Sequence, residues 1–453
     1  MTDKKRFYKN MAGIAIPITI QSLFQASLSL IDQIMIGHLG SDNIAGVGLG
    51  AKFASLFVVT VTAIVTVAGI MITQYRGSKN EKGVSDSFFI NLYLALFATI
   101  LFTLISTMIP NLVMNLYSND NSTIEASVTY LRITAFGFLP MTATLMISAL
   151  LRNVEYAKYP MYASVISVIL NTFLNYVLIL GKLGFPKLGL AGAALATTLA
   201  RVVEFIFILI MFIIVKNKLK LKLHIRFYYK KDFITKVCKI LLPILVCEFL
   251  WSLGENVYAI IYGHIGTEAC AAMTLTYPIQ SLMIGVFTGV ASASAILIGK
   301  RLGENNNKFA YEESILFIKL TLAVSIIMGV LIAILGKYYV LLFNVSDSVR
   351  KMTENIFYAY ALVFSAKVMN MVLGGGILRS GGKTKNIMFL NIFGTWCIGV
   401  PLGIITSYVF NLPIYYVYFF LSIEEFVRLL LGVILFRSKK WIHNVTESEI
   451  LAA

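Results

Sequence analysis

The chain has 453 residues, of which 58% are hydrophobic and only 13% are charged. A soluble domain carries about 25% charged residues, so the composition excludes that class of protein. The net charge of +16 would suit a nucleic-acid-binding protein, but the basic residues flank long apolar runs, where membrane topology explains them. The composition therefore indicates an integral membrane protein with no nucleic-acid partner.

Twelve apolar runs lie between charged or turn-rich breaks, and each is long enough for a transmembrane helix, which needs about 20 residues. In chain order they cover about 11–37, 44–74, 85–112, 123–150, 158–181, 188–215, 236–263, 270–299, 309–336, 349–378, 385–410 and 412–437. None shows the alternation of a membrane barrel strand. The predicted fold class is therefore an all-α integral membrane protein with twelve transmembrane helices.

The Lys and Arg residues are distributed unevenly between the two sets of loops. They gather in the N-terminal segment, in every second loop and after the last span. The opposite loops hold only Lys182, Lys187, Lys337, Arg350 and Lys351. By the positive-inside rule, both termini are expected in the cytoplasm of a multi-pass protein of the cell (plasma) membrane. The basic start runs directly into a full-length span, so no cleavable signal peptide is expected.

A basic loop in the middle divides the chain into two halves of six spans. The predicted organisation is a cytoplasmic N-terminus, a first lobe, a basic cytoplasmic linker, a second lobe and a cytoplasmic tail. These segments cover residues 1–10, 11–215, 216–235, 236–437 and 438–453.

The two halves are related by an internal repeat at an offset of 226 positions. Pro17 matches Pro243, and the Gly-His-x-Gly sequence at residues 37–40 recurs at residues 263–266. Because six spans separate the copies, both halves enter the membrane in the same direction, as in parallel repeats related by a pseudo-twofold axis along the membrane normal. Two such six-helix lobes favour a transporter that works by alternating access.

The sequence does not indicate an enzyme. It contains no G-x-S-x-G, H-E-x-x-H or Walker A motif. The four cysteines lack C-x-x-C spacing, so neither a disulfide framework nor a metal site is expected. With no nucleotide-binding domain and no cofactor motif, the energy for transport is expected from an ion gradient.

Several motifs in order give the chain a recognisable pattern. They are D-x-x-x-x-G-H-L-G over 32–40, IYGHIGT over 261–267, ASASAILIGKRLG over 291–303, ILRSGGKTK over 377–385 and KLGLAGAALATT over 187–198. With these motifs the chain resembles the MATE family (multidrug and toxic compound extrusion transporters) over essentially its full length. The resemblance implies two lobes of six helices and export of small organic, often cationic, compounds in exchange for H⁺ or Na⁺. We also expect a monomer surrounded by membrane lipids.

The resemblance places a coupling site in the first lobe, on the first-span Asp with polar groups of the fifth and sixth spans. Here these residues are Asp32, Asn171, Asn175 and Thr197. A carboxylate within a membrane helix is costly while charged, so it is suited to take up a proton or, with amide oxygens, Na⁺. Many family members have Asp at the position of Asn175, so a Na⁺ site at Asp32, Asn171 and Asn175 has less support and H⁺ is slightly favoured.

The second lobe offers its own acids, Glu255 and Glu248, as further candidates for cation or proton coupling. Lys367 stands about where some family branches carry an acid, which argues against copying the cation site of those branches. In the first span, Pro17 is the candidate for helix bending, because proline removes a backbone hydrogen bond.

Five residues are candidates for lining the substrate cleft, because aromatic faces and methionines suit bulky organic cations. They are Gln25, Trp251, Tyr258, Gln280 and Met283. Two other functions stay open at this point. One is a flippase or exporter of a lipid-linked or other amphipathic metabolite on a related two-lobe fold. The other is a non-transporting membrane scaffold or sensor, against which the buried acid and the even repeat argue.

Overall fold

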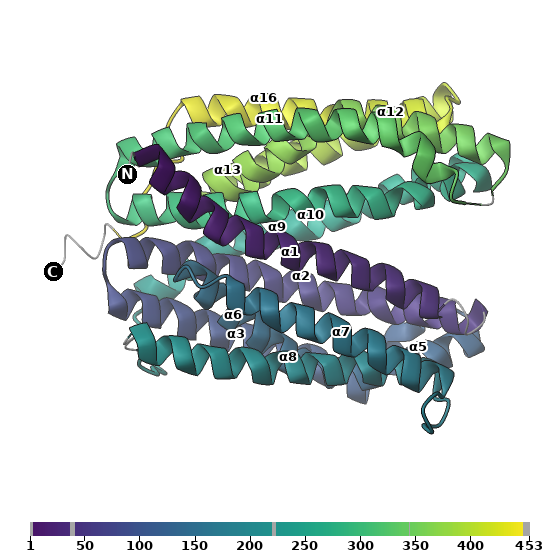
Figure 1. Ribbon diagram of the computed structural model, residues 1–453, viewed down its shortest axis with the longest axis horizontal. Helices are drawn as coiled ribbons and strands as arrows, with labels where there is room; N and C mark the ends of the chain where they lie inside the picture. The colour runs from purple at the N-terminus through teal and green to yellow at the C-terminus, as the bar shows by residue number, and fades with distance from the viewer. Residues whose placement is uncertain (1–2, 37–40, 220–222, 344, 447–453) are drawn as a thin grey trace. The chain divides into compact units, whose positions relative to one another are not determined.

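The computed structural model describes residues 3–36, 41–219, 223–343 and 345–446, and within them every regular element is a helix (Figure 1). The elements of the first half are α1 (Asp3–Ile36), α2 (Ser41–Gly77), α3 (Glu81–Met108), α4 (Pro110–Met114), α5 (Asn121–Ala135), α6 (Phe138–Asn153), α7 (Lys158–Leu180) and α8 (Gly189–Leu219).

The second half continues with α-helices and three stretches of π-helix, labelled η. These elements are α9 (Lys231–Ile265), α10 (Thr267–Gly303), α11 (Asn307–Val340), α12 (Asp347–Asn370), η2 (Met371–Leu378), α13 (Thr384–Ile392), η3 (Phe393–Gly399), α14 (Val400–Ile404), η4 (Ile405–Val409), α15 (Ile414–Leu421) and α16 (Ile423–Arg437).

The helical segments follow the twelve predicted spans in order. Within the described ranges, nine helices are long and apolar enough to cross a membrane, and a tenth span arises if the bent α5–α6 pair counts as one. α9 and the consecutive pair α15–α16 supply the other two helical segments. The expected all-α membrane fold is confirmed.

Several predicted spans are broken helices, a feature that apolar composition does not reveal. α5 and α6 meet at an angle of 49°. At their junction, Gly137 lies close to α8: a Cβ on this glycine would lie 3.6 Å from the Thr198 Cα. α3 ends before Pro110, which begins α4, because proline has no N–H to continue the hydrogen-bond ladder.

By their internal packing the residues divide into two units, which we call the N-unit (Ile16–Lys230) and the C-unit (Met1–Ala15 with Lys231–Ala453). In the N-unit, α2 packs against α3, α5 and α6, and α8 packs against α5, α6 and α7. Its core contains the stacked rings of Phe57 and Phe138, with centroids 4.2 Å apart. Small residues let these helices approach closely: a Cβ on Gly192 would lie only 2.5 Å from the Leu178 carbonyl oxygen.

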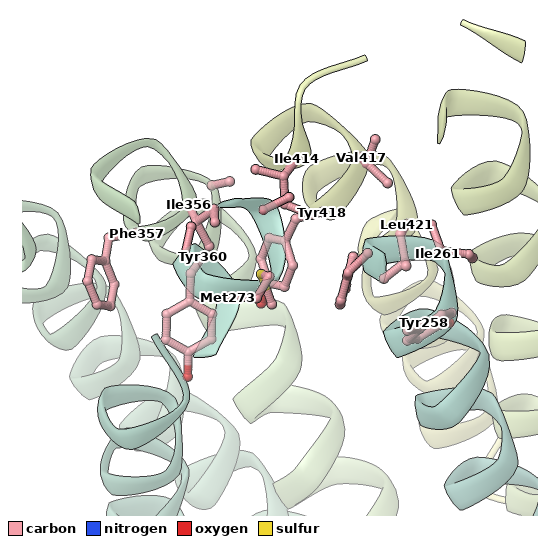
Figure 2. Packing of buried hydrophobic residues seen from close by; sticks show 14 of the residues in the cluster. Tyr258, Ile261, Met273, Ile356, Phe357, Tyr360, Ile414, Val417, Tyr418 and Leu421 are labelled. Carbon is pink, nitrogen blue, oxygen red and sulfur yellow. The ribbon is translucent and has the colours of Figure 1, made fainter. Parts of the chain in front are cut away.

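In the C-unit, α12 packs against α10, α11, α15 and α16. The resulting core is rich in aromatic side chains, and Figure 2 shows Tyr360, Met273 and Tyr418 lying together within it. After α12 the chain continues as η2, whose wider turns place Gly376 against Ser294 and the Ala291 carbonyl oxygen of α10. A side chain at this glycine would collide with α10, so glycine is required there.

Part of the predicted C-terminal tail packs against the C-unit. Trp441 is 1% exposed, stacks on Phe436 and donates a hydrogen bond from Nε1 to the Phe436 carbonyl oxygen (3.2 Å). Asn444 donates to Asn305, which follows α10 (2.5 Å). The described part of this segment therefore contributes to the fold of the C-unit.

Some predicted features lie outside the described residues. They are the first copy of the repeat signature at 37–40, the start of the N-terminal segment at 1–2, the linker positions 220–222 and the end of the tail at 447–453.

Candidate functional site

The carboxylate of Asp32 lies one turn before the end of α1 and faces polar side chains of α7. The side chain of Asn175 donates a hydrogen bond from Nδ2 to Asp32 Oδ1 over 2.6 Å. Asn171 is one helical turn away on the same face of α7, and both asparagines are 2% exposed. The structure thus brings together three of the four residues predicted for the first lobe, and two amides cover the acid from one side.

The fourth residue, Thr197 of α8, completes the arrangement through Asn171. When the Asn171 amide is oriented so that its oxygen accepts from the Thr197 backbone N–H (3.3 Å), its nitrogen lies 2.9 Å from Asp32 Oδ1. In the opposite orientation, the Asn171 oxygen accepts from Asn175 Nδ2 over 2.8 Å and its nitrogen donates to Thr197 Oγ1 over 3.3 Å, so Asn171 bonds to α8 in either orientation. The site joins α1, α7 and α8 through side chains that carry no charge except Asp32.

One buried oxygen at this site has no partner. Asn175 Oδ1 accepts no hydrogen bond within the described part of the chain, although a buried amide oxygen normally does. It belongs to the same amide that donates to Asp32. A proton on the carboxyl group, or a small cation, would supply the donor or positive charge that this oxygen lacks.

An apolar groove of about 640 Å³ lies between α1 and α7 of the N-unit, and Asp32 is not among its lining residues. The groove is lined by Leu23, Phe24, Ser27, Ile31, Met35, Val168, Ile169, Thr172, Phe173 and Tyr176.

Two residues that the sequence did not assign to the site act on Asp32. Tyr130 of α5 and Arg201 of α8 both lie within electrostatic range of the carboxylate. Tyr130 fits there because Gly50 of α2 has no side chain: a Cβ at that position would lie 2.8 Å from the Tyr130 ring. A tyrosine in a half-polar span does not stand out in the sequence as a site residue. Only the packing of α2 against α5 shows that Tyr130 lies near Asp32.

Arg201 is already paired with another acid. Its Nη1 lies 2.9 Å from Glu204 Oε2, and the Glu204 side chain is 3% exposed. Asp32 itself has no ion-pair partner within 4 Å in the described residues. Glu204 is therefore an ion-paired acid, whereas Asp32 has a hydrogen bond from Asn175 and the more distant Arg201 guanidinium.

The same interaction occurs once in each unit at positions related by the repeat. In the N-unit, Arg152 donates to Gln21 Oε1 over 2.8 Å. In the C-unit, Arg379 donates to Glu248 Oε1 over 3.2 Å, and the two pairs have the same sequence separation of 131 residues. Glu248 thus forms an ion pair at the place where the N-unit has a neutral amide.

Glu255 occupies a different environment from Glu248. It is exposed and makes no ion pair or hydrogen bond with a described residue, whereas Tyr258 and Tyr262 on the same face of α9 are 5% and 6% exposed. Glu255 is therefore more exposed than the two tyrosines that follow it on α9.

The structure also reveals a buried ionic cluster in the C-unit, formed by Glu424, Glu425 and Arg428. Arg428 lies 2.8 Å from both Glu424 and Glu425. Asn370 of α12 donates to Glu425 Oε2 over 2.8 Å. The buried Tyr258 hydroxyl and Glu424 Oε2 lie beside Gly399, where an added side chain would displace both.

The predicted cleft residues have different surroundings. Gln25 donates to Ser164 of α7 over 3.3 Å, and Trp251 is 46% exposed. Tyr258 and Gln280 are buried in the C-unit, and Met283 packs against its core. Pro17 lies inside α1, one residue after the start of the N-unit.

The described residues contain no group of three or more His, Cys, Asp or Glu side chains that could hold a metal ion. The four cysteines are unpaired.

Comparison with known proteins identifies the family. The MatE family model matches the chain twice, over residues 17–177 and 243–405. The two matches begin at Pro17 and Pro243, at the offset found in the sequence, so the internal repeat is confirmed.

Relatives and solved structures match over almost the whole chain. It is 25% identical over 407 residues to a "Probable multidrug resistance protein NorM" of Photorhabdus laumondii, covering 89% of this chain and 88% of the relative. It is 22% identical to the "Uncharacterized transporter YisQ" of Bacillus subtilis over 94% of both proteins. The crystal structure of "MATE in complex with MaL6" superposes with a TM-score of 0.87 at 21% identity, covering 95% of this chain and 96% of that one. That likeness shows the same fold. Since the family model matches more than half of the residues, the chain belongs to the MatE family of multi-pass membrane transporters.

Proposed function

We propose that the protein is a secondary active exporter that exchanges H⁺ for small organic, often cationic, compounds by alternating access. Several relatives bear the name of multidrug resistance proteins, which supports export of drug-like compounds by this chain. Membership of the MatE family supplies the transporter class. The coupling ion and the site of coupling are inferred from the residues around Asp32.

The observation that carries the proposal is the unpaired carboxylate of Asp32 under two buried amides. Asn175 Nδ2 donates to it over 2.6 Å, while Asn175 Oδ1 has no partner. An amide turned by 180° would present this oxygen to a protonated carboxyl group and accept its O–H. The same two asparagines can therefore satisfy Asp32 in both protonation states, which a group that cycles between them requires.

The surroundings of Asp32 favour H⁺ over Na⁺. A sodium ion is held best by several oxygen ligands with carboxylates among them, and the nearest groups here are amides that present nitrogen to the carboxylate. Asp32 is the single carboxylate among Asp32, Asn171, Asn175 and Thr197. One acid with hydrogen-bonding neighbours is sufficient for a proton.

We further propose that protonation of Asp32 is linked to bending of α1 at Pro17. The proline sits within the helix, where it removes one backbone hydrogen bond and weakens the ladder. The basic loops favour a protein of the plasma membrane whose N- and C-termini both lie in the cytoplasm. In that orientation, uptake of a proton from outside would drive export.

The experiment is efflux of a cationic dye from proteoliposomes under either an imposed pH gradient or an imposed Na⁺ gradient. We expect the pH gradient alone to drive efflux, and Asp32→Asn to abolish it while the variant still binds the dye. Glu125→Gln removes an exposed acid of α5 in the same unit and serves as the matched control. Efflux by Asp32→Asn at the wild-type rate, or efflux driven only by Na⁺, would contradict the proposal.

A further inference from the structure

The linker segment 223–230 is held against α3 by hydrogen bonds and an ion pair. Ser85 of α3 is 1% exposed, and its hydroxyl group accepts from the His224 backbone N–H over 2.8 Å and donates to the His224 carbonyl oxygen over 3.1 Å. Arg226 lies 3.4 Å from Asp86, the next residue of α3. The segment is therefore fixed to the first turns of α3, and both belong to the N-unit.

The same side of α3 continues as a stripe of exposed apolar side chains. The Phe227 ring stacks on Tyr93 of α3, with ring centroids 5.9 Å apart. Steps of three or four residues from Tyr93 lead to large apolar residues that are between 45% and 70% exposed, namely Phe97, Ile100, Leu101 and Leu104. Because α3 is long and apolar enough to cross a membrane, this stripe is suited to contact the hydrocarbon of the bilayer.

Charged, aromatic and aliphatic side chains follow one another along that stripe. Lys82 and Asp86 lie one turn apart near the start of α3, and the rings of Phe89 and Tyr93 come next, with centroids 6.2 Å apart. This order matches the passage from water through the headgroup region to hydrocarbon, in which aromatic side chains mark the headgroup level. Since Phe227 stacks on this aromatic part, the linker segment lies at the level of the lipid headgroups.

The segment presents apolar and basic side chains together. Ile225, Phe227 and Tyr228 are 64%, 87% and 85% exposed, which has a cost in water that contact with a bilayer removes. The Arg226 side chain is 48% exposed, and Lys230 is exposed as well. Aromatic rings beside a guanidinium and an ammonium group complement an anionic lipid surface, because the rings suit the headgroup region and the basic groups suit the phosphates.

We propose that residues 225–230 of the linker form a binding surface for the headgroups of anionic phospholipids. Phe227 and Tyr228 lie among the headgroups, and Arg226 and Lys230 contact the lipid phosphates. The Arg226 guanidinium has five N–H donors, so its ion pair leaves donors for a phosphate. Anionic lipids are favoured over zwitterionic ones because both basic residues then meet a surface of net negative charge. The inference does not depend on the proposed export function.

The test reports on lipid contact at the segment itself. The full-length Phe227→Trp variant is reconstituted into vesicles of phosphatidylglycerol and phosphatidylcholine, in which one lipid or the other carries bromine, a quencher of tryptophan fluorescence. The signal of the wild-type protein is subtracted to remove the three native tryptophans. The ratio of quenching by the two brominated lipids then measures the lipid preference at this position.

We expect phosphatidylglycerol to be preferred, and Arg226→Gln combined with Lys230→Gln to reduce the preference by about fivefold for each charge removed. Asp86→Asn removes the acid beside Arg226 and should increase the preference, whereas a purely structural role of the ion pair predicts a decrease. Lys182→Gln combined with Lys187→Gln removes the same charge from the exposed loop between α7 and α8 and should leave the preference unchanged.

Three results overturn the proposal. One is the absence of quenching by either lipid, as when water or another protein covers the segment. The second is equal quenching by both lipids. The third is a preference that decreases as much in Asp86→Asn, or in the Lys182→Gln and Lys187→Gln control, as in the Arg226→Gln and Lys230→Gln variant. None of these measurements involves transport, so failure of the export function would leave them unaffected.

Discussion

The Asn175 side chain donates a hydrogen bond over 2.6 Å to Asp32 Oδ1, and this bond links α7 to α1 at the candidate coupling site. A neutral amide occupies the position from which a second carboxylate could share an ion with Asp32. The identity of this one residue therefore bears directly on which cation the N-unit can bind.

Replacing Asn175 by Asp is expected to make efflux responsive to Na⁺. Two carboxylates at this separation cannot both stay charged without a proton or a metal ion between them, and paired carboxylates are good sodium ligands. The measurement is dye efflux under a Na⁺ gradient at constant pH. Asn175→Ser, which adds no charge, should not gain this response, and an unchanged ion preference in Asn175→Asp would contradict the prediction.

Replacing Gly50 by Ala is expected to impair the coupling site through Tyr130. The new Cβ would lie 2.8 Å from the Tyr130 ring, so the ring must move or the protein loses about 1–3 kcal/mol through overpacking. The melting temperature in detergent and the rate of pH-driven efflux should both decrease. Gly48→Ala on the same helix meets no atom within 4 Å and should behave like wild type. Equal effects of the two substitutions would refute the role of Tyr130.

Replacing Glu248 tests whether its ion pair with Arg379 stabilises the fold or takes part in transport. Glu248→Gln recreates the Arg–Gln pair that the N-unit already has at Arg152 and Gln21, so stability and transport should be nearly preserved. Glu248→Leu leaves the Arg379 guanidinium, which is 16% exposed, without its acceptor, and should cost about 1–3 kcal/mol. Loss of transport in a stable Glu248→Gln protein would instead assign Glu248 a role in coupling.

Replacing Trp441 by Ala is expected to destabilise the C-unit by about 3–5 kcal/mol, the usual loss for a fully buried large aromatic side chain. Trp441 is 1% exposed and lies against Gly381 and Phe436. The comparison is Ile442→Ala, whose side chain is only partly buried. A melting temperature equal to that of wild type would show that the segment after α16 does not stabilise the C-unit.

The sequence by itself predicted the fold class and the repeat because both depend on patterns along the chain. Apolar runs about 20 residues long predict membrane helices whatever their neighbours are, since the bilayer sets the length. The constant offset from Pro17 to Pro243 reveals a repeat that the family model matches in both halves. Asp32 also stood out, because a carboxylate in an apolar run is rare enough to be noticed alone.

The tertiary structure decided which side chains meet, because those contacts join residues far apart in the chain. Apolar composition does not report where a span breaks, so the bend between α5 and α6 and the π-helices of the C-unit were not predicted. The glycine that admits Tyr130, the hydrogen-bond donor missing at Asn175 Oδ1 and the stacking of Phe227 on Tyr93 depend on distances between segments that are far apart in the chain. Composition and spacing fix the lengths and order of membrane helices, whereas the charges that remain unpaired follow from how those helices pack.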